Sequence, residues 1–347
     1  MTRSLAALLL ATALSACGGD AGTVEPTPAP QVDDSLASAV EIDIVKAVDD
    51  APLAADAVVE DLGGSFGWSE GPVWIKDGGY LLFTDVPGKT IWRYDDADGL
   101  SVYRQPSTLP GAELADDAEG ANGLFAYGET EILVPDHGSR TLYALSLEDG
   151  RARPLATEFE GKRFNSPNDV VVHSNGTLYF TDPPYGLSGD DDPAKELPYS
   201  GVFALSPDGE VSLVDSSLTR PNGIALSPDE STLYVAVSDP KDAKFVAYPV
   251  GADGTVGEGE VILDVTEDLA AEGFGNPDGM AVATDGTIFA TGPGGLLVLS
   301  PDGEIPSRIR MGKPCANATF GNDGTVLYMT CYDQLYRVPT RRTGLGF

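Results

Sequence analysis

Six segments of the chain each place one oxygen-bearing side chain just ahead of an apolar run. These side chains, called the ring residues below, are Glu70, Asn122, Asn168, Asn222, Asp278 and Asn317. Two carboxylates and four carboxamides offer oxygen ligands with no thiolate or imidazole, and hard divalent cations prefer such a set. Ca²⁺ suits it best, because it tolerates irregular oxygen coordination. If the six residues converge, they predict a cation site.

A simpler interpretation exists for each ring residue taken alone. Asn and Asp often cap strands and turns, and that explains any single Asn better than metal binding does. The cation site is favoured because six such residues recur, with Glu70 in SEGPVW among them.

The segment RFNSPNDVVVHSNGTLYFTDPPYG (163–186) indicates which element carries a ring residue. VVV and LYF are typical of strands, and SNG between them predicts a tight hairpin turn. A hairpin brings the start of its first strand beside the end of its second. Asn168, Asp169, Thr181 and Asp182 are therefore expected at one edge of a sheet.

Hairpins of this kind recur six times, and their ring residues are 39 to 56 residues apart. Most are followed by a further strand, which is the pattern of propeller blades. The sequence thus predicts an all-β, six-bladed β-propeller whose ring residues surround one mouth of the central channel. A strand from roughly residues 40–66 is expected to help close the ring. The single helix candidate is weak and lies at 265–273.

The ordered motifs SEGPVW, RFNSPND, FTDPPYG, RPNGIALSPD and NPDGMAV resemble the gluconolactonase/senescence-marker-protein (regucalcin-like) family over roughly residues 60–340. The resemblance implies a six-bladed propeller with one divalent metal at the channel mouth, and hydrolysis of sugar lactones or related esters. Motif by motif, it implies Glu70, Asn168, Asn222 and Asp278 as metal ligands, with Asp278 also the general base. Ca²⁺ is the expected ion, with Zn²⁺, Mn²⁺ and Mg²⁺ as alternatives.

Contacts to the substrate are expected around the same mouth. Asn122 is one candidate. Family members often carry His-Gly where this chain has His137, so His137 is either a substrate contact or a plain loop residue. Arg163 precedes the third ring residue, where some members hold substrate. Tyr185 in DPPYG either walls the pocket or packs its loop. The segment 188–200 is either a lid over the mouth or a solvated insertion.

The proposed chemistry also follows from the residue types. A divalent cation can polarise a lactone carbonyl while a carboxylate deprotonates water, and the chain has no G-x-S-x-G, HExxH or Walker motif. Two alternatives stay open. One is a related hydrolase acting on phosphotriesters, and the other is a non-catalytic propeller that binds a ligand. A pure interaction propeller has no reason to keep Glu70 together with Asp278.

The N-terminal residues predict export. Residues 1–16 have the basic start, apolar run and small-residue cleavage site of a signal peptide. LSAC at 14–17 resembles a bacterial lipobox, which implies lipidation of Cys17; an ordinary secretory signal is the alternative. Residues 17–40 are expected to form a flexible acidic tether, and 41–347 the catalytic propeller. The protein is thus expected to be a membrane-anchored lipoprotein facing the periplasm or the cell exterior.

The net charge excludes some classes of binding partner, and the cysteines bear on whether a disulfide forms. The formal net charge of −33 argues against binding nucleic acid, or anionic lipid headgroups through the propeller. We expect a small lactone or ester substrate, a monomer, and membrane contact only through the lipid. The last predicted hairpin brings Cys315 beside Cys331, so export predicts a disulfide between them, with two free packed thiols as the alternative.

Overall fold

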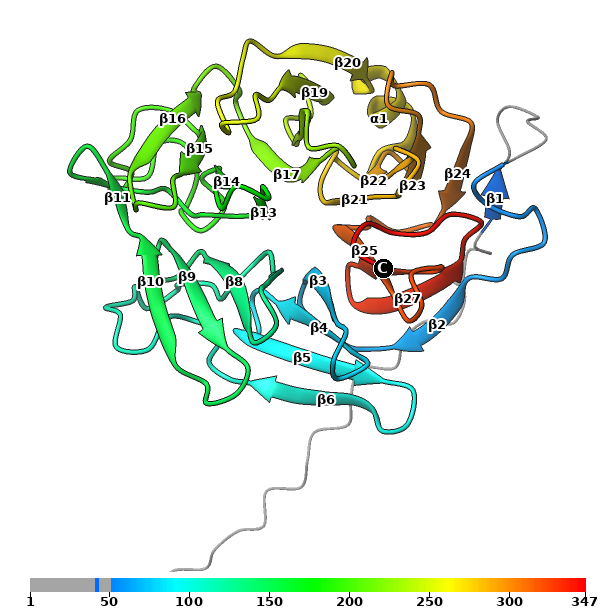
Figure 1. The fold of residues 1–347 in the computed structure, drawn as a ribbon, viewed down its shortest axis with the longest axis horizontal. Coiled ribbons are helices and arrows are strands. Elements are labelled where there is room, and N and C mark those ends of the chain that lie inside the picture. Colours follow the sequence, from blue (N-terminus) through cyan, green and yellow to red (C-terminus); the bar gives the residue numbers. More distant parts are fainter. Residues whose placement is uncertain (1–40, 44–50) are drawn as a thin grey trace, which may run out of the picture. The chain divides into compact units, whose positions relative to one another are not determined.

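The structure is a computed structural model that describes residues 41–43 and 51–347, all within one compact unit. Figure 1 shows its sheets arranged around a central axis. One short helix, α1 (Thr266–Glu272), lies where the sequence predicted it. In the described part of the chain, no helix has the length and apolar character needed to cross a membrane.

Six antiparallel sheets form the blades, and each begins with one of the six predicted hairpins. The predicted all-β, six-bladed propeller is therefore confirmed. Neighbouring inner strands contact each other around the axis, and the last inner strand meets the first. The strands of the six blades, inner strand first, are β3 (Ser69–Ile75), β4 (Tyr80–Asp85), β5 (Thr90–Asp95) and β6 (Gly99–Arg104); β7 (Phe125–Tyr127), β8 (Glu131–Asp136), β9 (Thr141–Ser146) and β10 (Ala152–Ala156); β13 (Val170–Val172), β14 (Leu178–Asp182), β15 (Gly201–Leu205) and β16 (Val211–Asp215); β17 (Pro221–Leu226), β18 (Thr232–Val237), β19 (Lys244–Pro249) and β20 (Glu260–Asp264); β21 (Met280–Val282), β22 (Ile288–Gly292), β23 (Gly295–Leu299) and β24 (Ser307–Arg310); β25 (Asn317–Gly321), β26 (Val326–Cys331) and β27 (Gln334–Pro339).

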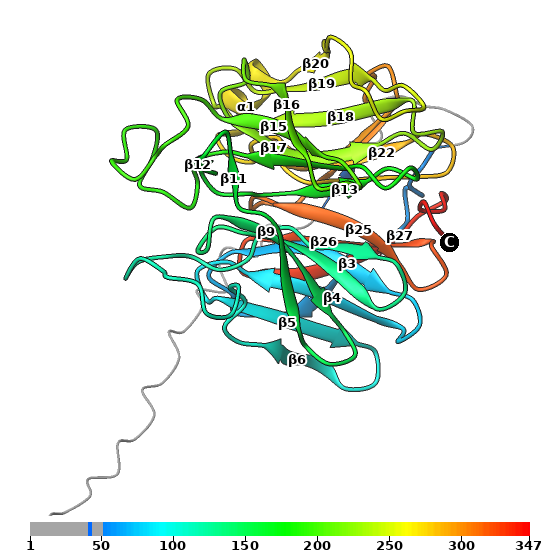
Figure 2. The same cartoon turned by 60° about the vertical axis from the view of Figure 1, so that its left-hand side comes forward.

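The ring is closed by a strand from the start of the chain, as predicted. The outer strand of the sixth blade is β2 (Glu60–Gly63), which pairs antiparallel with β27. The short strand β1 (Glu41–Asp43) pairs with β24 on the fifth blade. Figure 1 shows β1 beside β24 and β2 beside β27, and Figure 2 shows the same blades turned by 60°. A small separate hairpin, β11 (Glu158–Phe159) with β12 (Lys162–Arg163), precedes the third blade.

Glycines let the inner strands approach one another closely. Gly223 directly follows a ring residue, and a Cβ at this position would lie 2.2 Å from the Asp278 carbonyl oxygen. A Cβ at Gly71 would lie 2.2 Å from the Asn122 carbonyl oxygen. Real Cβ atoms do not approach oxygen this closely, so these positions require glycine. The third blade has Asp169 at the matching place, and its side chain points across to the backbone N–H of Ile224.

The second strands of the first and third blades end in a Thr-Asp pair, and these side chains bond to backbone groups of neighbouring segments. The Thr181 hydroxyl donates to the Asn222 carbonyl of the next blade at 2.6 Å, and Thr84 donates to Asn122 at 2.8 Å. The Asp182 carboxylate accepts the N–H groups of Asn165 and Ser166, both at 2.7 Å. The threonine thus joins two blades, and the aspartate holds the loop that enters its own inner strand.

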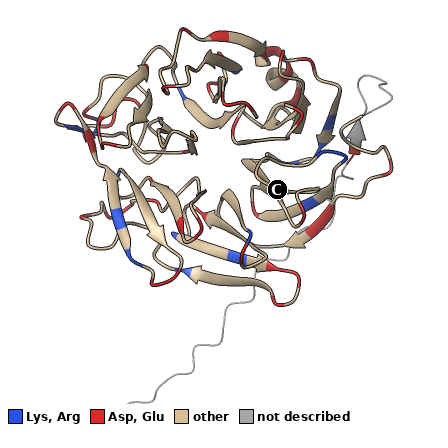
Figure 3. Ribbon diagram, in the orientation of Figure 1, with Lys and Arg blue, Asp and Glu red and all other residues tan. Residues whose placement is uncertain are grey.

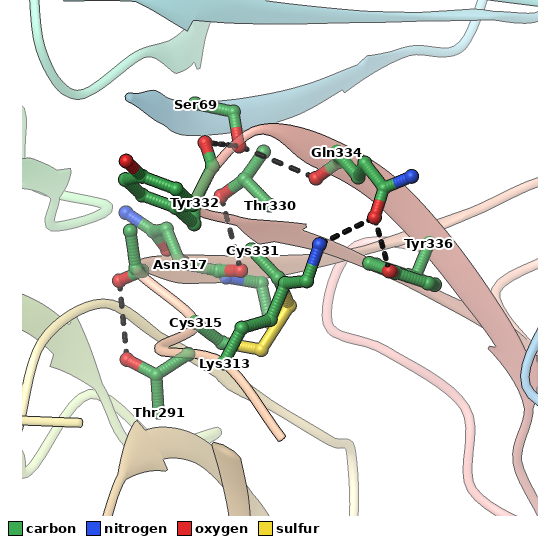
Figure 4. The surroundings of a disulfide bond; sticks show 12 residues. Ser69, Thr291, Lys313, Cys315, Asn317, Thr330, Cys331, Tyr332, Gln334 and Tyr336 are labelled. Atoms are coloured by element: carbon green, nitrogen blue, oxygen red, sulfur yellow. Dashed lines mark hydrogen bonds between the residues drawn. A yellow bond between two sulfur atoms is a disulfide. The ribbon is translucent and has the colours of Figure 1, made fainter. Parts of the chain in front are cut away.

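The sixth blade contains the predicted disulfide between Cys315 and Cys331, which lie 16 residues apart in the sequence. Both cysteines are buried. Figure 4 shows the bond beside Asn317, with Lys313 and Gln334 nearby. The disulfide therefore joins the segment that leads into β25 to the end of β26.

The segment 188–200 joins β14 to β15 without strand or helix. Arg140 donates to the Ala194 carbonyl at 2.9 Å, and the Lys195 ammonium donates to the Leu197 carbonyl at 2.8 Å. None of its residues lines the cavity at the channel mouth that is described below. The segment is thus held by contacts to Arg140 of the second blade and to Arg220 before the fourth.

Candidate active site

A cavity of about 320 Å³ lies at one mouth of the channel, and five of the six ring residues line it. Two larger cavities, of 480 and 650 Å³, lie elsewhere in the described residues. The 480 Å³ cavity is lined mainly by apolar side chains. The 650 Å³ cavity is lined mainly by polar side chains, most of which are exposed or half-buried, and it contains no ring residue. Chemistry rather than size therefore identifies the mouth cavity as the candidate site. Its ring residues are Glu70, Asn122, Asn168, Asn222 and Asp278.

Strand geometry explains why these side chains meet. Glu70 and Asn222 lie near the starts of β3 and β17, while Asn168 and Asp278 come just before β13 and β21. All inner strands run in the same sense around the channel, so their starts meet at one mouth. All four side chains are at least nine-tenths buried.

Burial and neighbouring charges raise the pKa values of both acids of the cavity. Burial raises the pKa of Glu70 to about 7; the charge of Asp169 adds to the shift, and hydrogen bonds from Gly71 and Asn317 oppose it. Burial also raises the pKa of Asp278 well above its usual value, with the charges of Glu70 and Asp169 adding to it. Three carboxyl groups thus share one poorly solvated region, which a bound cation would stabilise.

One carboxylate oxygen in this region lacks a protein partner. Asp278 Oδ1 is buried and makes no hydrogen bond to any part of the chain that the structure describes. Such an oxygen is costly unless a ligand occupies the space before it. The described residues contain no cluster of three or more His, Cys, Asp or Glu side chains suited to a metal. The mouth cavity instead offers two carboxylates together with carboxamide oxygens, and such a set fits a hard cation.

The sixth ring residue does not line the mouth cavity. Asn317 Nδ2 donates to Glu70 Oε2 at 3.3 Å, and its Oδ1 accepts the Ala318 N–H at 2.8 Å. Together with Asp169, Asn317 instead lines the 480 Å³ cavity at the other end of the channel. These two side chains separate the cavities, and Asn317 supports Glu70 from behind.

The structure brings three of the four predicted substrate contacts to the cavity: Asn122, His137 and Tyr185. Burial and the charge of Asp278 both raise the pKa of the Tyr185 hydroxyl. Arg163 is not brought there. Its side chain is exposed, and its guanidinium donates to the Ser139 carbonyl at 3.1 Å.

Four further side chains line the cavity that the sequence analysis did not single out: Trp68, Glu119, Ser238 and Asn276. Trp68 and Asn276 stand two positions before Glu70 and Asp278, and residues two apart share a face of an extended chain. Ser238 directly follows β18, as His137 directly follows β8. The strand period could therefore have identified Trp68 and Asn276, and the ends of the second strands Ser238, whereas no such signal marks Glu119.

Comparisons with known proteins agree with this geometry. A gluconolactonase from Zymomonas mobilis subsp. mobilis is 36% identical over 303 residues, which cover 85% of each chain. Regucalcin from Oryctolagus cuniculus is 28% identical over 302 residues, covering 80% of this chain and 91% of the relative. A solved gluconolactonase structure from Xanthomonas campestris superposes with a TM-score of 0.74 at 28% identity, covering 86% of this chain and 95% of that one.

The family model described as the SMP-30/gluconolactonase/LRE-like region matches residues 68–333. This range holds every residue of the mouth cavity and the inner strands of all six blades. The chain therefore belongs to the SMP-30/gluconolactonase/LRE-like family.

Proposed function

We propose that this protein hydrolyses sugar lactones at the mouth cavity with one divalent cation held by Glu70, Asn168, Asn222 and Asp278. As a member of its family, the protein is a hydrolase of the lactonase type. The observation that carries the cation proposal is the buried, unpartnered Asp278 Oδ1 beside a second buried acid. Ca²⁺ is the proposed ion, with Zn²⁺, Mn²⁺ and Mg²⁺ as alternatives.

Each group of the cavity has a proposed role in the reaction. A cation bound there would supply Lewis-acid polarisation of the substrate carbonyl. Asp278 acts as the general base and takes a proton from the attacking water. Asn122 and Tyr185 form the walls against which the sugar ring lies, and His137 lies beside them against Asn168. The partly buried mouth restricts access of bulk water and strengthens these polar contacts.

A lactone panel tests the proposal. The purified protein is stripped with a chelator, assayed on sugar lactones, and assayed again after each of the four cations is added singly. We expect activity to be lost on stripping and restored best by Ca²⁺. A phosphotriester and a simple aryl ester are included as controls. Activity that survives complete metal removal would contradict the cation, and turnover of the phosphotriester alone would contradict the substrate class.

We also propose that the protein is a monomer anchored to the membrane through a lipid on Cys17. Cys17 lies outside the described residues, so the support is the LSAC motif and the apolar run before it. Cys17→Ser is expected to move the protein from the membrane fraction to the soluble fraction. Wild-type protein found soluble and uncleaved downstream of Cys17 would contradict the anchor, and size-exclusion chromatography with light scattering tests the monomer.

A further inference from the structure

A carboxamide binds a cation through its oxygen only, yet its oxygen and nitrogen ends have nearly the same shape. An Asn ligand is therefore useful only if something fixes which end faces the ion. The two predicted Asn ligands, Asn168 and Asn222, both have a side-chain partner beside them at the cavity wall.

His137 is the partner of Asn168. His137 Nδ1 lies 3.0 Å from Glu119 Oε2, and its Nε2 lies 3.3 Å from Asn168 Nδ2. The Glu119 carboxylate can only accept, so His137 Nδ1 carries a proton. The Asn168 amide nitrogen can only donate, so His137 Nε2 accepts from it. The Asn168 nitrogen therefore faces His137, and its oxygen faces the cavity.

Ser238 orients the Asn222 amide in the same way, through a hydroxyl instead of an imidazole. Its hydroxyl donates its one proton to the Pro277 carbonyl. The same oxygen is left to accept from Asn222 Nδ2, at 3.0 Å. Ser238 is almost fully buried, at 2% exposure, and the Tyr185 hydroxyl is within hydrogen-bond reach of both Ser238 and Asn222. The Asn222 nitrogen is held at the wall, and its oxygen is again directed inward.

We infer that His137 and Ser238 are positioning residues, each of which fixes one predicted ligand amide with its oxygen toward the cation. This inference rests on the proposed cation site. It gives His137 a role through Asn168, because both imidazole nitrogens already have protein partners. It also gives a role to Glu119, which sets the tautomer of the imidazole.

The backbone holds both positioning residues rigidly. The His137 N–H donates to the Gly120 carbonyl at 3.2 Å, and a Cβ at Gly186 would lie 2.7 Å from His137 Cβ. Gly186 therefore packs directly against this histidine. The Ser238 N–H donates to the Arg220 carbonyl at 2.9 Å. Partners that are themselves fixed hold a ligand in a single orientation.

The test measures Ca²⁺ affinity by calorimetry on the stripped full-length protein, without substrate. His137→Leu and Ser238→Ala are each expected to weaken Ca²⁺ binding by about tenfold to a hundredfold. His137→Gln, whose amide oxygen can still accept from Asn168, is expected to recover most of the affinity. Melting temperature and KM are recorded for every variant. If His137→Leu does not fold, Ser238→Ala still tests the inference.

Matched controls come from the far side of the blades. His173 is a second buried histidine and accepts the Asn175 N–H at 3.1 Å. Ser227 is a second buried serine, in the turn of the same hairpin as Asn222, and donates to Asp229 at 2.7 Å. His173→Leu and Ser227→Ala are expected to change stability but not Ca²⁺ affinity.

The outcomes separate this inference from the proposed function. Wild-type protein that binds no divalent cation overturns the cation site, and the inference with it. Wild-type protein that binds Ca²⁺, with both variants binding equally well, overturns the inference alone. A raised KM at unchanged Ca²⁺ affinity in His137→Leu would make His137 a direct substrate contact and overturn its positioning role.

Discussion

Glu70 and Asp278 are both buried acids. The charge of Glu70 helps to raise the pKa of Asp278, and the charge of Asp169 helps to raise the pKa of both. Acids that only cap strands would be stabilised by partners for all their oxygens. Asp278 Oδ1 lacks one among the described residues. The arrangement is thus better suited to holding a cation than to stabilising the empty fold.

Substituting each acid by its amide separates metal binding from proton transfer. Glu70→Gln is expected to weaken metal affinity, with activity partly restored by excess metal. Asp278→Asn keeps an oxygen but loses the base, so excess metal is not expected to restore turnover. The measurements are bound metal, melting temperature and lactone hydrolysis. Full activity of Asp278→Asn at saturating metal would contradict Asp278 as the base and leave the metal site standing.

Stability gives a second readout for the same two variants. Each substitution removes one of the mutually repelling charges, so the melting temperature of the metal-free protein is not expected to fall. A lower melting temperature with unchanged metal content would instead indicate that the two acids serve only as caps.

Side-chain direction was the part of the site that the sequence could not resolve. The pattern placed Asn317 and Asn168 at equivalent positions, and both are at strand starts. However, the pairing of β3 with β4 and of β17 with β18 shifts register next to their ring residues, whereas β25 pairs regularly with β26 from Asn317 onward. A register shift changes which side chains reach the mouth, and the sequence pattern does not mark it. Arg163 shows the same limit. It lies in β12, and its guanidinium donates to the Ser139 carbonyl between β8 and β9 of the second blade, a contact that no sequence pattern indicates.

Among the elements, the hairpins were predictable because their signals are local. Each combines an apolar run, a turn of Gly, Asp or Asn, and a second apolar run. The sixfold repetition of this pattern supports the hairpin prediction. The link between blades is not local. The hydroxyl of Thr181 bonds a carbonyl 41 residues away, at Asn222. The repeat pattern of the sequence does not indicate such a contact, although it does place Thr181 and Asp182 at the edge of the sheet.

Thr181→Val tests this link between blades. The Thr181 side chain is fully buried, and valine keeps its shape but removes the hydroxyl. The Asn222 carbonyl then lacks a donor, which is expected to lower the free energy of unfolding by about 1–3 kcal/mol. Urea denaturation measures the change.

The matched control for that link is Thr255→Val, because the Thr255 hydroxyl bonds Asp253 in an exposed turn. We expect a change within about 0.5 kcal/mol for this variant. Equal effects of the two substitutions would show that Thr181 contributes no more than an exposed turn contact.

The disulfide acts within the sixth blade, where the closing strand also pairs. Because Cys315 and Cys331 enclose a loop of 16 residues, their bond is expected to contribute about 3 kcal/mol. Reductant is expected to lower the urea midpoint of the wild type but not that of a Cys315→Ala, Cys331→Ala double variant. Two thiols, besides Cys17, that react with an alkylating agent in the unreduced, unfolded protein would contradict the bond.

At the scale of the whole molecule, the surface is acidic all around the ring. Figure 3 shows Asp and Glu in strands and turns of every part of the described chain, with fewer Lys and Arg between them. The formal net charge is −33. A field of this sign attracts cations and repels polyanions, which agrees with a small-molecule substrate and a cation site at the mouth.

Two truncations distinguish the N-terminal tether from the strand that closes the ring. The cavity residues lie between Trp68 and Asp278, and β2 begins at Glu60. A chain starting at residue 41 keeps β1, β2 and the buried Leu53. It is expected to be soluble, with the melting temperature and kcat of the full-length protein. A chain starting at residue 65 loses both strands, which leaves the edge of β27 unpaired and the ring open.

The shorter chain is therefore expected to melt at a lower temperature and to lose lactonase activity, because a weakened sixth blade no longer holds the first and fifth blades, which carry Glu70 and Asp278, in place. Activity is measured on both truncations with the same lactone and cation. If the chain starting at 65 melts like the one starting at 41, closure by β2 does not stabilise the propeller. The inner strands, with their glycine contacts and their threonine links between blades, would then hold the ring without it.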